Sequence, residues 1–255
     1  GIRFLFAGIL VTIIAIIQKR KFKVEQKSVV AWLLLFALVN TALHYLFSYV
    51  GLGYLPSSRS TILDSMNGFF AIILSCIIFE DDKFSKFKAL GCILGFSGIL
   101  LINIEPGQNF FQGISFRGDG MILLNALCGA FGGIITRIIS KKMDMTVATS
   151  LSMTIGGAFL CVVSAIIGPA ARWTITTESI IIMIGLILIS AVCFGVYNQL
   201  LAYHPISKIA IFNAFIPILG VIFSSIILEE PMRVKYIIAG CMVALGVYVM
   251  NHFSK

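Results

Sequence analysis

The segment YLPSSRSTILD at residues 54–64 recurs as YHPISKIAIFN at residues 203–213, at a constant offset of 149 residues. The correspondence continues without a gap to residues 102 and 251. In a chain this apolar, a tandem repeat of several hydrophobic spans is typical of membrane proteins built from two related halves. The identical pairs include Tyr54 and Tyr203, Pro56 and Pro205, Ser58 and Ser207, Ile62 and Ile211, Ser75 and Ser224, Glu80 and Glu229, Lys86 and Lys235, Gly91 and Gly240, and Cys92 and Cys241.

The composition of the chain supports the same class. Of 255 residues, 59% are hydrophobic and only 12% are charged, with a mean hydropathy of +1.02. A soluble domain carries about twice that share of charge. The long apolar stretches predict an all-α polytopic membrane protein, because an outer-membrane barrel shows short alternating segments instead. The net charge of +8 lies mostly in loops on one side, so we expect no nucleic-acid partner.

Nine apolar spans follow one another, each near the length of a helix that crosses about 30 Å of hydrocarbon. Alternate loops then lie on opposite sides. One side holds 13 Lys and Arg residues and the other holds six, so the positive-inside rule places the first side and the C-terminus in the cytoplasm. The spans cover residues 2–17, 30–50, 60–79, 87–104, 120–139, 148–168, 180–201, 209–228 and 234–252.

The offset of 149 also relates the spans to one another. Spans 2–17, 30–50, 60–79 and 87–104 map onto the last four spans, whereas span 120–139 has no counterpart. We therefore expect a first repeat at residues 1–105 and a complete second repeat at residues 106–255. Because each complete repeat has an odd number of helices, the halves are predicted to be inverted across the membrane. Each complete repeat is predicted to have five helices, and the first half is predicted to lack its first helix. A complete protein would therefore have ten helices.

Several motifs resemble the EamA-type members of the drug/metabolite transporter superfamily. IRFLFAGIL (2–10) is similar to the second helix of that family, and GYLPSSRSTIL (53–63) and AYHPISKIAIF (202–212) resemble the start of its fourth and ninth helices. AFIPILGVIFSSIILEEPM (214–232) and AGCMVALGVYVMN (239–251) resemble its last two helices. One departure is Gly68, which stands where Pro217 stands in the second half.

The resemblance implies secondary transport, without ATP, of a small metabolite such as an amino acid or a related compound, and it favours export. It implies a multi-pass protein of the cytoplasmic membrane, as a monomer or homodimer. The alternative is a non-transporting membrane scaffold or a truncated inactive homologue. We expect no enzymatic activity, because no nucleophile converges with a base. The six cysteines lie inside spans without metal-ligand spacing, so neither a metal nor a cofactor is expected.

Polar side chains in the outer half of three spans form the first candidate site. Asp64 is the only acidic residue well inside a span, and an ionised Asp near the bilayer centre costs about 2.5–3.5 kcal/mol. Asn67 lies on the same helical face, His44 and Asn40 lie on the helix before it, and Asn125 is at similar depth. We predict a substrate or proton site, with Asp64 as counter-ion or proton carrier. The alternative is an interhelical hydrogen-bond clamp.

The repeat places a second candidate set in the inner half. Asn213 is the counterpart of Asp64, and Asn198 is the counterpart of Tyr49. These positions carry no charge comparable to that of Asp64, so any charge-dependent step belongs to the first half. For Asn198 the alternative is a solvated helix end. Gly68 and Pro217, near the middle of their predicted spans, are candidate hinges.

Overall fold

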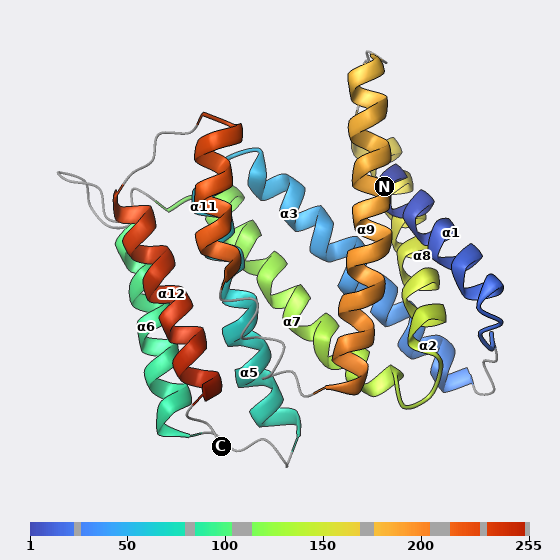
Figure 1. Ribbon diagram of the computed structural model, residues 1–255, viewed down its shortest axis with the longest axis horizontal. Helices are drawn as coiled ribbons and strands as arrows, with labels where there is room; N and C mark the ends of the chain where they lie inside the picture. Colours follow the sequence, from blue (N-terminus) through green and yellow to red (C-terminus); the bar gives the residue numbers. More distant parts are fainter. Residues whose placement is uncertain are drawn as a thin grey trace. The chain divides into compact units, whose positions relative to one another are not determined.

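The computed structural model is helical throughout the part of the chain that it describes, with no β-strand there (Figure 1). It describes residues 1–22, 27–79, 85–103, 114–168, 176–204, 215–229 and 234–252. Nine helical segments cover these residues: α1 (Ile2–Ile17), α2–η1–α3 (Lys27–Phe36, Ala37–Leu43 and His44–Leu52), α4–α5 (Ser57–Asp64 and Met66–Ile78), α6 (Lys86–Asn103), η3–α7 (Phe116–Gly120 and Met121–Ile139), α8 (Met145–Ile167), α9 (Thr177–Tyr203), α11 (Phe215–Ile227) and α12 (Val234–His252).

The helices have the length and composition of membrane spans. Five are long and apolar enough to cross a bilayer: Lys27–Leu52, Ser57–Ile78, Phe116–Ile139, Met145–Ile167 and Thr177–Tyr203. The most apolar of them, α9, has a mean hydropathy of 2.8 over its best window, and only 11% of that window is buried. Each of the nine spans predicted from the sequence overlaps one of the nine described helical segments, and span 209–228 is described from residue 215. The predicted class, an all-α polytopic membrane protein, is confirmed.

Helices α1 and α8, which the repeat makes equivalent, pack against each other along their length. Gly1 lies against Cys161, whereas Gly8, two turns later, lies against Thr154. The residue numbers rise along α1 as they fall along α8, so the two helices are antiparallel. Small residues at the contact allow this close approach, as is usual between helices in lipid.

Helices α6 and α12 form a second equivalent pair with the same geometry (Figure 1). Gly91 of α6 lies against Gly246 of α12, and Gly98 lies against Ala239. The direction is again antiparallel. Gly91 and Gly95 both lie against Gly246, so these glycines serve close packing.

Helix α4 contacts α11, and the two belong to the third pair of equivalent spans, 60–79 and 209–228, although α4 and α11 are not counterparts themselves. The Ser58 hydroxyl donates to the Ser224 hydroxyl at 3.3 Å, and Thr61 lies against Gly220. In three cases, helices from spans that are equivalent in the repeat are thus antiparallel neighbours. This is the relation that a twofold axis in the membrane plane imposes on two inverted halves.

The chain forms two compact units, each with its own core. Unit 1 contains residues 1–43 and 132–204, and Phe36 and Ile139 are fully buried in its core. Unit 2 contains residues 44–131 and 205–255, and Met66, Phe69 and Val243 are fully buried in its core. Each unit therefore draws helices from both predicted repeats. The repeat boundary near residue 105 lies outside the described residues and stays a prediction.

Three of the spans depart from regular α-helix at a defined point. Span 27–52 has π-helical geometry over Ala37–Leu43, and span 116–139 begins with a π-helical turn over Phe116–Gly120. Span 57–78 is interrupted at Ser65, where the Gly68 amide donates to the Ser65 carbonyl at 3.3 Å. The Ser65 hydroxyl also donates to the Thr61 carbonyl at 2.8 Å, a contact that bends helices. Such irregular turns are frequent at functional sites.

Candidate functional site

Asp64 is the last residue of α4, directly before the interruption at Ser65. The Asn125 side-chain amide, from α7, donates to Asp64 Oδ1 at 2.5 Å. No Lys or Arg in the described part of the chain forms an ion pair with Asp64. A carboxylate at membrane depth is therefore compensated by a neutral amide, so its charge is only partly balanced.

His44 reaches the same point of unit 2 from another helix. It is the first residue of α3, where the π-helical segment ends. Its ring Nδ1 lies 3.0 Å from the main-chain oxygen of Asn125. A carbonyl oxygen only accepts, so Nδ1 carries a proton and donates, and Nε2 is the acceptor of the neutral ring. Asn125 thus connects the histidine through its main chain and the carboxylate through its side chain.

Asn125 also has an unused acceptor. The residue is only 2% exposed, and its Oδ1 is buried without a hydrogen-bond partner in the part of the chain that the structure describes. Burying an unpaired amide oxygen costs about 1–3 kcal/mol. A buried polar atom without a partner next to a carboxylate is typical of a site that completes its hydrogen bonds when a ligand or water binds.

Asn67 and Gly129 complete the cluster. A Cβ at position 129 would meet the side-chain nitrogen of Asn67, and it would lie 3.1 Å from Cε1 of His44. Asn67 and the imidazole of His44 therefore pack against α7 at Gly129, where the helix lacks a side chain. The structure brings together four of the predicted residues, namely Asp64, His44, Asn67 and Asn125.

An ion pair that the sequence analysis did not foresee also lies in unit 2. Arg59 of α4 binds Asp119 of η3, with Nη2 at 2.6 Å and Nε at 2.8 Å from Oδ1. The Asp119 side chain is only 4% exposed, and its Oδ2 accepts the Ser115 amide at 2.9 Å. Arg59 and Asp119 each directly precede a predicted span on the same side of the membrane. That shared position was the signal for their pairing.

Comparison with known proteins assigns the chain. The model of the EamA-like transporter family matches residues 1–104 and 116–252, which is nearly the whole chain. The chain belongs to the EamA-like transporter family. Its fold and the transporter names of its relatives agree with that assignment and identify a membrane transporter rather than an enzyme. A small-molecule substrate and a lipid bilayer are its partners by family.

Relatives of this EamA-like protein come from several kingdoms. It is 26% identical to "Uncharacterized transporter YvbV" of Bacillus subtilis, over all of this chain and 82% of that protein. It is 23% identical to YoaV of the same organism, over all of this chain and 86% of that protein. It is 25% identical to the chloroplastic WAT1-related protein At3g02690 of Arabidopsis thaliana, over 98% of this chain and 61% of that protein.

A solved structure supports the fold of the EamA-like protein. The structure, titled only "Crystal structure of protein", superposes with a TM-score of 0.70 at 10% identity. The match covers 99% of this chain and 86% of the other. At this identity the likeness concerns the fold alone.

The remaining predicted site residues of the EamA-like protein lie elsewhere. Asn40 belongs to unit 1, where its side-chain oxygen lies against Gly132. Tyr49 is 51% exposed, and its ring lies 6.1 Å from that of Tyr45. Asn198 is 2% exposed and donates to the Thr149 hydroxyl at 3.1 Å, so it joins α9 to α8 and is not a solvated helix end. Asn213 lies outside the described residues.

The two candidate hinges differ in what surrounds them. Gly68 is buried in α5, and a Cβ there would meet only a methyl group of Val247, at 3.9 Å. The helix therefore has a glycine where a side chain would fit. Pro217 lies in the first described turn of α11, and its carbonyl oxygen would lie 3.8 Å from a Cβ at Gly240. The residues before α11 lie outside the described part, so a kink at Pro217 stays a prediction.

Proposed function

We propose that this protein is a secondary transporter that exports a small polar or amphipathic metabolite, such as an amino acid or a related compound, by alternating access. Membership of the EamA-like transporter family supports transport as such. The inverted packing of equivalent helices supports alternating access, because two related halves can exchange inward- and outward-open states.

The observation that best supports this proposal is the hydrogen bond between Asp64 and Asn125, with His44 bound to the main chain of the same asparagine. Asp64 and Asn125 Oδ1 offer acceptors at membrane depth, and His44 offers a ring that exchanges protons. This set suits a ligand that brings hydrogen-bond donors, such as an ammonium group. Leu63 and Ala126, the chain neighbours of Asp64 and Asn125, are fully buried in the apolar core of unit 2, so these polar side chains start from its edge.

We also propose that Asp64 couples transport to protons. Ionised Asp64 accepts hydrogen bonds strongly, from the Asn125 amide or from a cationic ligand. The protonated acid is neutral and binds both of these donors less strongly. His44 shares Asn125 with Asp64, and Arg59, which lies on the same helix as Asp64, is paired with Asp119. Because the charges of Arg59 and Asp119 compensate each other, we assign proton exchange to Asp64 and His44.

We further propose that the protein lies in the plasma membrane with its C-terminus in the cytoplasm. The excess of Lys and Arg in alternate loops supports this orientation. An exporter in this orientation would take its substrate from the cytoplasm.

The substitution Asp64→Asn tests the proposal in proteoliposomes. It keeps the size of the side chain and a hydrogen-bonding oxygen but removes the ionisable proton. A substrate is first found with a panel of labelled amino acids. We expect its net transport by the variant to lose its dependence on pH, while exchange of substrate across the membrane continues. Glu178→Gln, in the exposed first turn of α9, is the matched control and should keep the dependence of the wild type.

Two results would contradict the proposal. An unchanged pH dependence in Asp64→Asn would refute coupling through this carboxylate. No transport of any compound by folded wild-type protein, across a panel wider than amino acids, would favour the non-transporting scaffold instead.

A further inference from the structure

A basic cleft lies within unit 1, and it shares no residue with the polar cluster of unit 2. It is open, with a volume of about 1000 Å³. Among the described residues, four basic and one acidic line it, and together they carry a net charge of +3. Its lining comes from the end of α1 and from the turn between α7 and α8, and consists of Gln18, Lys19, Arg20, Lys21, Ser140, Lys142, Met143 and Asp144.

The end of α1 turns three basic residues toward this cleft. The Arg20 amide donates to the Ala15 carbonyl and the Lys19 amide donates to the Ile16 carbonyl, both at 2.9 Å. This is the Schellman arrangement, in which the residue after the C-cap adopts a left-handed conformation. Lys19 occupies that position with φ of 53°. The helix stops abruptly, and the chain reverses at the mouth of the cleft.

Lys19 is an unfavourable residue for this conformation. A left-handed residue is usually glycine, because a side chain there costs about 1 kcal/mol. Strain of this kind persists where the side chain itself is needed. The counterpart of Lys19 in the second half is Gly168, whose φ of −102° is not left-handed, so the left-handed turn belongs to the end of α1 alone among these two helix ends.

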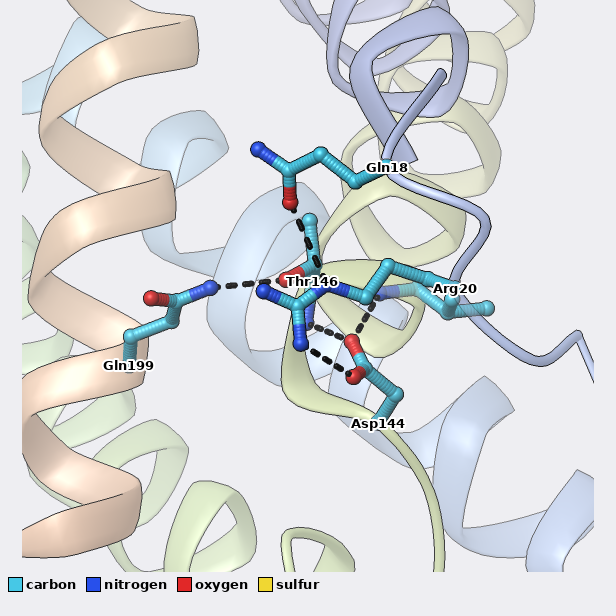
Figure 2. Close-up of polar contacts among 6 residues, drawn as sticks. Gln18, Arg20, Asp144, Thr146 and Gln199 are labelled. Carbon is cyan, nitrogen blue, oxygen red and sulfur yellow. Dashed lines mark hydrogen bonds and ion pairs between the residues drawn. The ribbon is translucent and has the colours of Figure 1, made fainter. Parts of the chain in front are cut away.

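The single acidic residue of the cleft is already engaged, as Figure 2 shows. Asp144 caps α8 by accepting the amides of Thr146 at 2.9 Å and Val147 at 3.4 Å. Its other oxygen binds Arg20 Nη1 at 3.4 Å, and Arg20 Nε donates to Gln18 at 3.1 Å. These bonds hold the two sides of the cleft together.

Three lysines therefore carry uncompensated charge. Lys19, Lys21 and Lys142 are exposed, and none of them forms an ion pair with a carboxylate in the residues that the structure describes. The ammonium group of Lys142 lies 5.7 Å from the ring centre of Trp32. Tryptophan and lysine together are typical of the membrane–water interface.

We propose that this cleft binds a phosphate-bearing anion, supplied by the headgroup of an acidic phospholipid. Three ammonium groups and a guanidinium around one opening provide the charge and the donors that a phosphate accepts. The source is argued from the neighbouring residues. Ile16 and Ile17, in the last turn of α1 beside the cleft, are 61% and 73% exposed. An acyl chain covers such side chains, whereas a free phosphate does not.

The test uses the full chain in detergent, with thermal unfolding as the readout. Phosphatidylglycerol, phosphatidylcholine and inorganic phosphate are titrated separately into the wild type. We expect phosphatidylglycerol to raise the melting temperature, phosphatidylcholine to leave it unchanged, and phosphate alone to act weakly or not at all. A shift with phosphate equal to that with phosphatidylglycerol would retain the phosphate chemistry but overturn the lipid source.

Two variants and one control make the assignment specific. Lys19→Gly removes a charge and relieves the left-handed backbone, so its melting temperature without lipid should equal or exceed that of the wild type. Its apparent affinity for phosphatidylglycerol should nevertheless fall several-fold, and Lys19→Gly combined with Lys21→Gln and Lys142→Gln should abolish the shift. Lys141→Gln is the matched control, since Lys141 is exposed in the same turn but does not line the cleft. Equal shifts in the wild type, the triple variant and Lys141→Gln would overturn the proposal.

Discussion

Gly129 is the residue on which the geometry of the polar cluster depends most directly. A Cβ at this position would collide with Asn67 and lie 3.1 Å from Cε1 of His44. We expect Gly129→Ala to displace both side chains at a cost of about 1–3 kcal/mol, which corresponds to a loss of transport of roughly 5- to 150-fold if the cost falls on the transport barrier. Gly133→Ala is the matched control, because a Cβ there would meet only Leu201 at 4.0 Å. Transport assays in proteoliposomes compare them, and equal activity of the two variants would contradict this account.

At the residue scale, the sequence predicted which residues form the polar cluster, but it did not predict which atoms of these residues are in contact. Asp64, His44, Asn67 and Asn125 were predicted to converge because polar residues deep in apolar spans need partners. The contact between His44 and a main-chain oxygen could not be predicted, since any helix presents such oxygens. Arg59 was counted only as a loop charge, although it is engaged in a buried ion pair. The transport role of these residues stays a prediction.

At the element scale, Gly68 and the interruption at Ser65 make span 57–78 the candidate moving helix. A Cβ at Gly68 has room, so Gly68→Ala should not strain the packing. We expect it to raise the stability by about 0.5–1 kcal/mol, because alanine favours helix, and to lower the transport rate, because the helix bends less easily. Thermal unfolding and initial transport rates are the measurements. A stabilised variant with an unchanged rate would exclude a hinge at this residue.

The irregular turns mark the limit of sequence prediction for single elements. Hydrophobic spans gave the helices to within a few residues, because their length is set by the bilayer. The π-helical segments at Ala37–Leu43 and Phe116–Gly120 left no comparable signal. They depend on the tertiary contacts of each helix, which periodicity does not encode. These turns nevertheless precede the two helices that carry His44 and Asn125.

At the scale of the whole molecule, the repeat was the most informative part of the sequence. It predicted inverted halves. The antiparallel contacts of α1 with α8 and of α6 with α12, which are counterparts, agree with that prediction, as does the contact of α4 with α11 between the equivalent spans 60–79 and 209–228. It did not predict that each compact unit would combine helices from both halves. Sequence equivalence specifies which helices correspond, whereas their grouping depends on side-chain packing between them.

Tyr54 and Tyr203 provide a direct test of inversion, because they are equivalent in the repeat and both are exposed, at 56% and 78%. Inverted halves place equivalent residues on opposite faces of the membrane, whereas parallel halves place them on the same face. In a cysteine-free background, we expect an impermeant maleimide added outside intact cells to label Tyr54→Cys but not Tyr203→Cys. Lys141→Cys, in a lysine-rich turn, is the cytoplasmic reference and should react only after permeabilisation. Labelling of both tyrosine positions from the same side would exclude inversion. Labelling of Tyr203→Cys but not of Tyr54→Cys from outside would reverse the orientation, so that substrate taken from the cytoplasm would meet the other half first.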